Sequence, residues 1–477
     1  MTDTSAFQAD PDVRFTQSEG AGVGYGISNH SGVPNPERGA GKTRIYTVFN
    51  TAPNAKDETV EITLWDYTGD LRRLEAVDSA FYPLPLQVLD REPVKYWDHR
   101  YVRVLVKCSV PAMGYATIAL REKPVEDYPT FYLRDDRVEL PKGDISLENE
   151  YISARIDGRS GLMVSCVDKV SGKELLSAPA GLCVVDTEHN GMSGWIIGRY
   201  LKMNPVDSAV SIRPISGNLR CGVEMKHTML DSSVKTTIVL DAGAKALKYT
   251  FSVDWNESAN KYDTYPVLVY RMPLAENADE VMMDVPAGAA VRSARAMDLP
   301  ALSYAAALSG ERAPVIVTDC KHGYRLNRNE LIATLINTSN NPDPYPERGI
   351  HTIELYVGAC DANPKALRDM AASLVRPMFG MSAYSHQGTL PVDSAMFVFD
   401  AATSVLSSVA SDKNVMKLRV FETCGKADKV SVTLPSDVKA AAVTDLEGAV
   451  IGKADICGKT VSFDIGAHKL MQLNVTI

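Results

Sequence analysis

The chain has 477 residues, of which 45% are hydrophobic and 23% charged, and its formal net charge is -9. A chain of this length can form two to four domains with well-buried cores, and its ordinary composition excludes disordered and fibrous proteins. The negative charge and the lack of any Lys/Arg run exclude nucleic acid as a partner, because a phosphate backbone requires clustered cations.

The eight cysteines are scattered, without a C-x-x-C pair or a Cys/His cluster at zinc-finger spacing, and we expect them to be reduced core residues. The first thirty residues are polar, and no run approaches the roughly 18 apolar residues of a membrane span. We therefore expect a cytoplasmic protein without a membrane partner.

The chain opens with glycine and small polar residues, at 18–26 and again at 34–41. Such a composition is typical of a linker or of a loop laid against another domain. The Gly20 to Gly26 run is not preceded by a strand pattern, so a phosphate-binding loop is a poor interpretation of it.

From Arg44 onward, alternation of apolar and polar residues predicts half-buried strands. The longest alternation lies at 247–255, where five apolar residues, the last of them Trp255, alternate with polar ones. This pattern is typical of an antiparallel strand with one buried and one solvent-exposed face. Further strands are predicted at 60–64, at 102–108 and at the end of the chain, 471–477.

Helix signals are few. Residues 363–375 predict a helix, because Asn363 can cap it, Pro364 suits its first turn and Pro377 stops it. Its apolar stripe would be formed by Leu367, Met370, Ala371 and Leu374. A second, weaker helix is predicted at 301–308.

Many strands separated by turn signals predict a mainly β fold of several β-sandwich domains with few helices. We expect four segments: a Gly-rich linker at 1–43, a small β-domain at 44–127, a large β-sandwich at 128–387 and a C-terminal β-sandwich at 388–477.

Catalytic motifs are missing from the sequence: it has no Walker loop, G-x-S-x-G elbow, H-E-x-x-H or dinucleotide-binding fingerprint. No two of the eight histidines lie at metal-ligand spacing on one predicted element. The sequence therefore predicts neither a catalytic group nor a metal site in this chain.

Several phrases resemble glycoside hydrolase family 38 α-mannosidases, in the order that the family uses. The clearest are Asn190-Gly191-Met192-Ser193-Gly194-Trp195-Ile196-Ile197-Gly198, which is similar to "HGMTAWEIG", and Val253-Asp254-Trp255-Asn256-Glu257, which is similar to "VDWNE". Other similar phrases lie at 38–50, 111–115, 147–175, 319–324, 341–351 and 419–425. The resemblance runs from about residue 18 to the end, and it covers the all-β C-terminal half of the family.

The resemblance implies a galactose-mutarotase-like form for the large sandwich and a retaining hydrolysis of terminal α-mannosides by the whole enzyme. It also implies that a divalent metal, usually zinc, is bound by Asp and His residues of an N-terminal catalytic barrel, which supplies the Asp nucleophile. The barrel phrases "H.D..W" and "HHDA.TGT" do not occur here. We therefore expect an inactive C-terminal portion without a metal of its own, which is a piece of a longer protein or, as a second choice, the product of a split gene. Its barrel would lie in cis or on a separate chain.

By the same resemblance, the loop around Asn341-Pro342-Asp343-Pro344 approaches the sugar. Asn337 occupies the position where relatives usually have an Arg. Trp195 is expected in the core. The candidates for the rim of a substrate pocket are Asn337, Asp343, His351, Lys321, His322 and Tyr324.

Two other functions stay open. The chain could be a stand-alone carbohydrate-binding or scaffolding module, for which aromatic residues on an open face would be evidence. A free-standing mutarotase or lyase ranks last, because the only sequence feature that favours it is His189 beside Glu188.

A surface that the barrel would cover in the whole enzyme should be apolar and, in this chain, exposed. We therefore expect the isolated chain to self-associate, or its residues 1–40 to be disordered.

Overall fold

The computed structural model describes residues 2–7, 41–90, 92–96, 99–123, 143–189, 191–259, 264–343, 347–383 and 385–477. The Gly-rich run 20–26 lies outside this part of the chain, and of the residues 1–40 that were predicted to be disordered only 2–7 are described. The described residues form a mainly β structure with few helices, as the sequence predicted. They divide into two compact units: one takes the described residues of 1–137 with 217–219 and 376–398, and the other takes 138–216, 220–375 and 399–477.

The first unit is a small sandwich of two antiparallel sheets around a core that includes Tyr46, Val48, Ile62 and Val104. One sheet has the order β28 (Phe379–Ala383), β1 (Arg44–Asn50), β8 (Gly114–Glu122), β3 (Leu74–Val77) and β4 (Pro83–Leu84), with β29 (Ser394–Ala395) beside β8. The other has the order β2 (Lys56–Trp65), β7 (His99–Val110) and β5 (Leu86–Val88), with β6 (Val94–Tyr96) beside β7. The alternation predicted at 60–64 and 102–108 is confirmed in β2 and β7.

Segments far apart in the sequence complete this small sandwich. β28 pairs with β1, with Phe379 opposite Phe49 and Ala383 opposite Ile45. The sequence gives no sign of this pairing, because a strand of five residues with mixed burial has no clear period. The four-part division of the chain by residue number stays a prediction.

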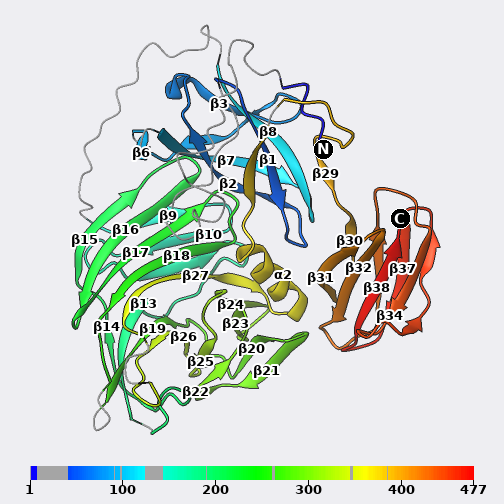
Figure 1. Ribbon diagram of the computed structural model, residues 1–477. Coiled ribbons are helices and arrows are strands. Elements are labelled where there is room, and N and C mark those ends of the chain that lie inside the picture. Colours follow the sequence, from blue (N-terminus) through cyan, green and yellow to red (C-terminus); the bar gives the residue numbers. More distant parts are fainter. Residues whose placement is uncertain are drawn as a thin grey trace. The chain divides into compact units, whose positions relative to one another are not determined.

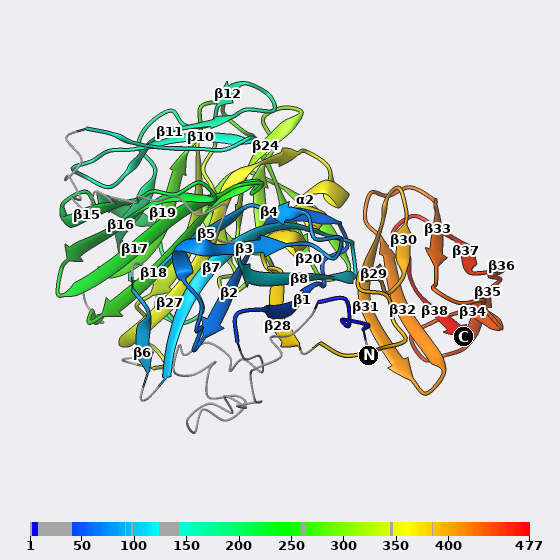
Figure 2. The same cartoon turned by 90° about the horizontal axis from the view of Figure 1, so that it is seen from above.

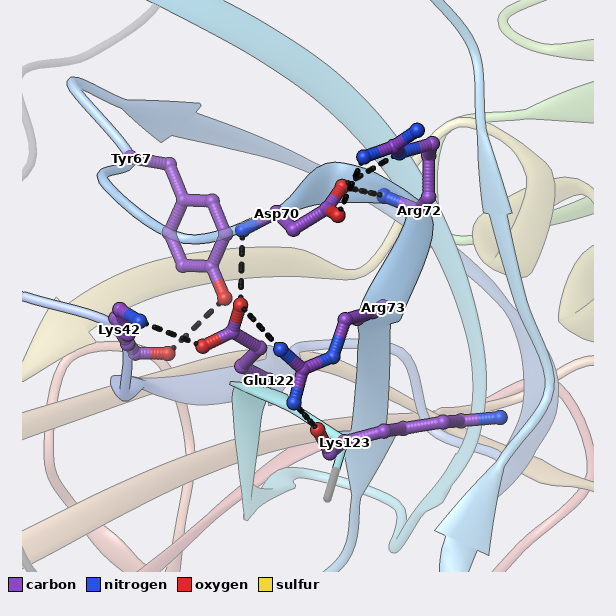
Figure 3. A network of polar contacts seen from close by, with 7 residues as sticks. All are labelled: Lys42, Tyr67, Asp70, Arg72, Arg73, Glu122 and Lys123. Carbon is purple, nitrogen blue, oxygen red and sulfur yellow. Dashed lines mark hydrogen bonds and ion pairs between the residues drawn. The ribbon is translucent and has the colours of Figure 1, made fainter. Parts of the chain in front are cut away.

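A polar network ties the end of β8 to the 3-10 turn η2 (Leu71–Arg73), as Figure 3 shows. Glu122 accepts hydrogen bonds from Lys42 Nζ at 2.8 Å, from Arg73 Nη1 at 3.2 Å and from the backbone N–H of Asp70 at 3.2 Å. The hydrogen bond from Lys42 is the main reason that the pKa of Glu122 lies below its usual value. These contacts connect the end of β8 to the turn that precedes β3.

The second unit contains a large sandwich, formed by a six-stranded and a nine-stranded sheet that share one hydrophobic core (Figure 1). The six-stranded sheet has the order β14 (Tyr200–Pro205), β13 (Gly181–Thr187), β19 (Tyr265–Pro273), β26 (Glu330–Asn337), β25 (Gly323–Leu326) and β22 (Arg295–Pro300). The nine-stranded sheet has the order β15 (Ala209–Ile215), β16 (Arg220–Met229), β17 (Ser232–Asp241), β18 (Ala246–Trp255), β27 (Gly349–Asp361), β24 (Arg312–Val317), β23 (Tyr304–Ala307), β20 (Glu280–Val285) and β21 (Gly288–Ser293). A smaller sheet has the order β12 (Lys173–Glu174), β11 (Met163–Asp168), β10 (Ile152–Ile156) and β9 (Ile145–Glu148).

The predicted strand at 247–255 is β18, and its apolar residues from Leu247 to Trp255 are buried while Ser252 and Asp254 are exposed. The predicted helix is α2 (Pro364–Leu374), whose first turn is capped by the Asn363 side chain accepting from the backbone N–H of Ala366 at 2.9 Å. The helix predicted at 301–308 is wrong, because its central residues form strand β23.

The C-terminal residues of this unit form a second sandwich of two sheets, whose strands are drawn in orange and red in Figure 2. One sheet has the order β30 (Val398–Asp400), β33 (Asp428–Thr433), β37 (Thr460–Ile465) and β36 (Asp455–Cys457). The other has the order β31 (Ser404–Asp412), β32 (Val415–Glu422), β38 (Leu470–Thr476), β34 (Ala440–Thr444) and β35 (Val450–Gly452). The predicted final strand is confirmed as β38.

Candidate functional site

Two loops leave the same end of the six-stranded sheet. β13 and β26 are both antiparallel to β19, which lies between them, so their last residues, Thr187 and Asn337, lie at one end of the sheet (Figure 1). The loop after β13, residues 188–199, and the polar segment 337–343 at the end of β26 are called the paired loops below. The sequence predicted the second of them as a sugar-facing loop.

Hydrogen bonds join the paired loops to each other around Ser193. Its Oγ accepts from the backbone N–H of Asn340 at 3.0 Å and donates to Asn340 Oδ1 at 3.2 Å, while Asn337 Nδ2 donates to the Ser193 carbonyl at 3.0 Å. The backbone N–H of Gly194 donates to the carbonyl of Asn341 at 2.8 Å. Ser193 is fully buried, so these bonds are shielded from water and hold the two loops together.

Gly198 in the first loop has no room for a side chain, and Gly194 has little. A Cβ on Gly198 would lie 2.0 Å from the carbonyl oxygen of Glu188, and one on Gly194 would lie 3.1 Å from that of Asn341. The backbone N–H of Gly198 also donates to the Tyr265 hydroxyl at 3.3 Å. The loop therefore packs backbone against backbone.

Both loops are also anchored to the sandwich. At the exit of the first loop, the Tyr200 ring lies 3.5 Å from the Arg325 guanidinium, and Arg325 Nε donates to Asp298 Oδ1 at 2.8 Å. At the base of the second loop, Trp255 Nε1 donates to Thr338 Oγ1 at 2.9 Å. Burial raises the pKa of Tyr200, so this phenol stays neutral at physiological pH.

The outer side of the first loop is a single helical turn, formed by residues 192–196. The backbone N–H groups of Trp195 and Ile196 both donate to the Met192 carbonyl, at 2.9 and 3.1 Å. The side chains of Trp195, Ile196 and Met192 are 73%, 53% and 37% exposed. The expected core position of Trp195 is therefore wrong, because Ser193 is the buried residue of this turn and Trp195 is exposed.

Of the predicted pocket residues, Asn337 and Asp343 lie in the paired loops. Asn337 Oδ1 is buried and makes no hydrogen bond among the described residues, and Asp343 is exposed. His351, in β27, is half-buried, and its Nε2 lies 2.6 Å from the Glu347 carbonyl oxygen.

The other three candidates belong to the segment that leads into β25. His322 is exposed and its Nδ1 lies 3.0 Å from the Leu302 carbonyl oxygen, while Lys321 is half-buried. Tyr324, in β25 itself, is fully buried in the core of the large sandwich. The sugar-binding role of the six candidates stays a prediction.

Sequence reasoning missed Ser193, Asn340 and Arg199. The only sequence feature that could have indicated that the second loop binds the first is the run of small polar side chains from Asn337 to Asn341, directly after an apolar strand. His189 and Glu188 do not form a pair: His189 Nε2 lies 3.1 Å from Asn340 Oδ1, and Glu188 binds Arg199 through two hydrogen bonds of 2.8 Å. Those bonds hold the pKa of Glu188 below its usual value.

Within the described ranges, no group of three His, Cys, Asp or Glu side chains could hold a metal ion. The donor set that the resemblance assigns to zinc therefore has no counterpart in this part of the chain, and no catalytic step through a metal can be assigned to it. No helix in the described residues is long and apolar enough to cross a membrane.

Residues 147–345 match the family "Glycosyl hydrolases family 38 C-terminal domain". An α-mannosidase from Enterococcus faecalis V583 has a similar structure, with 11% identity and a TM-score of 0.68 over 91% of this chain and 56% of that chain. A family 38 protein from Enterococcus faecalis gives 12% identity and a TM-score of 0.69, over 91% of this chain and 58% of that chain. This chain thus spans less than two thirds of either structure.

A galactose mutarotase-like protein from Lactobacillus casei ATCC 334 also matches, at 11% identity over 46% of this chain, but its TM-score of 0.30 is too low to carry an argument. The sequence matches no curated protein sequence. The fold that this chain shares along 91% of its length is that of the two family 38 structures. Residues 147–345 thus match the C-terminal domain of glycosyl hydrolase family 38, the family that the sequence phrases predicted, and the chain shares its fold with two family 38 structures.

Proposed function

We propose that this chain is the non-catalytic C-terminal portion of an α-mannosidase, which supports a catalytic barrel and contributes loops to its substrate pocket. The observation that carries the proposal is the coverage: the two family 38 structures match nearly all of this chain, but only 56% and 58% of their own chains. Each of them therefore has a large further part without a counterpart here.

The whole enzyme would hydrolyse terminal α-mannosides with retention, and its divalent metal, zinc by resemblance, would be bound by the barrel. In this chain the paired loops are the best candidates for reaching the substrate. They are fixed to each other and to the sandwich by buried hydrogen bonds, which is the support that a pocket-lining loop needs.

The stand-alone carbohydrate-binding module is the second candidate function. The observation that favours it is Trp195, whose side chain is largely exposed on a fixed turn. Under either function we propose a cytoplasmic location, which is supported by the eight cysteines, all of them free.

The test is hydrolysis of an aryl α-mannoside by the purified chain, with and without added zinc. We expect no turnover above the uncatalysed rate and no tightly held zinc by elemental analysis, because the sequence shows neither the nucleophile nor the ligand phrases. Robust turnover by the pure chain, or one zinc bound per chain, would overturn the proposal.

A further inference from the structure

The turn at residues 192–196 has its polarity reversed relative to an ordinary surface turn. The polar Ser193 is fully buried, whereas the apolar Met192, Trp195 and Ile196 are exposed to solvent. Tryptophan is on average one of the more buried residue types, so a tryptophan side chain that is 73% exposed beside two other exposed apolar side chains is a candidate ligand contact.

The backbone beneath Trp195 is fixed before any ligand arrives. The backbone N–H of Gly194, the residue before Trp195, donates a hydrogen bond to the Asn341 carbonyl. The backbone N–H of Trp195 and that of Ile196 each donate to the Met192 carbonyl. The close approach of Gly198 to Glu188 closes the other end of the loop. An indole on such a turn can bind a ligand without the entropic cost of ordering a loop.

The neighbouring polar groups favour a sugar over an apolar protein surface as the ligand. The same loop carries the Glu188–Arg199 ion pair, with the Arg199 side chain 77% exposed, and the facing loop carries the exposed Asp343. A pyranose ring has one face of C–H groups, which suits an indole face, and a rim of hydroxyls, which suits charged and amide groups. Burying these charges under an apolar partner would instead be costly.

We propose that Trp195 is a stacking platform for a pyranose ring of an α-mannoside. The indole face carries the contact, and the polar groups of the paired loops bind the ring hydroxyls. The choice of an α-mannoside rests on the proposed function, whereas the platform itself rests on the geometry of the turn.

The test titrates the 477-residue chain with an α-linked mannobiose and follows the Trp195 indole N–H signal by NMR, with Trp195→Ala, Trp195→Phe, Met192→Ala and Ile196→Ala as variants. We expect Trp195→Ala to weaken binding about tenfold, while Trp195→Phe, which keeps a flat ring, retains most of it. Met192→Ala and Ile196→Ala should bind like the parent. Thermal unfolding of each variant should match the parent, because these side chains are exposed.

The proposal is overturned if the parent chain does not bind mannobiose, or if Trp195→Ala binds as well as the parent. It is also overturned if Met192→Ala and Ile196→Ala lose as much binding as Trp195→Ala, because the turn would then act as an apolar contact. Hydrolysis by the isolated chain would contradict the proposed function alone and leave these binding results unchanged, so the two failures can be distinguished.

Discussion

Ser193 connects the paired loops through both its side chain and its backbone. Its Oγ makes one hydrogen bond with the Asn340 backbone and one with the Asn340 amide, in a site closed to water. Removing the Oγ would leave the half-buried backbone N–H of Asn340 without this partner, which is more costly than the loss of an exposed hydrogen bond.

We expect Ser193→Ala to lower the free energy of unfolding by about 1–3 kcal/mol. The measurement is urea unfolding followed by circular dichroism. The matched control is Ser208→Ala, because Ser208 is exposed, and it should change the unfolding free energy by less than about 0.5 kcal/mol. Equal effects of the two changes would contradict the bracing role of Ser193.

His227 is a buried histidine in the large sandwich, beside a cavity of about 20 Å³ that is also lined by Met225, Tyr249 and Phe251. Its Nε2 lies 2.9 Å from the Ser160 carbonyl oxygen, which requires the hydrogen to be on Nε2, and its Nδ1 makes no hydrogen bond among the described residues. Burial is the main reason that the pKa of His227 is lowered from 6.5.

A lowered pKa means that the folded state favours the neutral ring. The stability that this provides is present above pH 6.5 and is lost as the pH falls through the folded-state pKa, because protons then bind the unfolded chain more tightly. We expect His227→Gln, which keeps a donor for Ser160 but does not titrate, to gain stability relative to the parent between pH 7 and pH 5, in buffered thermal unfolding scans. A constant difference between the two proteins across this range would contradict the role of His227.

β28 is an element whose exposed residues suggest association between chains. It is the last strand of its sheet in the described structure, and Phe379 and Met381 are 45% and 55% exposed. The Phe379 ring stacks on Phe49 with the centroids 5.4 Å apart, which extends the apolar surface onto β1. Apolar strands at a sheet edge favour association.

We expect the isolated chain to self-associate through this surface, and Met381→Lys to shift it toward the monomer in concentration-dependent light scattering. The side chain of Met381 is exposed, so the thermal stability of the monomer should change little. The control is Val170→Lys, an exposed apolar residue of the other unit, which should leave association unchanged. A parent chain that is monomeric at all concentrations would contradict this prediction.

The sequence predicted strands well where one face of the strand is buried and the other is exposed to solvent. In β18 the alternation from Leu247 to Trp255 gave both the strand and its buried face. It failed for β23, where Ala305 and Ala307 face the main core and Tyr304 and Ala306 pack in the cluster that includes α2. A strand that is buried on both faces shows no alternation of apolar and polar residues. Its run of alanines was therefore mistaken for a helix.

The candidate site was only partly predictable. Asn337 and Asp343 were found from the resemblance, and the structure places both in the paired loops. Ser193, Asn340 and Arg325 were not found, because their importance comes from contacts between segments more than 100 residues apart in the sequence. Trp195 was assigned to the core from its residue type, although its turn is held by its neighbours and leaves the indole outside.

At the scale of the whole molecule, we propose that the chain acts together with a separate catalytic part. The match of residues 147–345 to the family 38 C-terminal domain and the partial coverage of both family 38 structures support this proposal. If the account is right, the catalytic part should depend on this chain for its stability and for part of its pocket.

The measurement that tests this most directly is the rate of aryl α-mannoside hydrolysis by the proposed catalytic part, produced separately, with and without the 477-residue chain in equimolar amount. The account predicts that kcat/KM rises at least about tenfold when the chain is added, equivalent to about 1.4 kcal/mol of transition-state stabilisation. The chain alone should give no turnover. Full activity of the catalytic part without this chain, together with no association between the two in light scattering, would contradict the account.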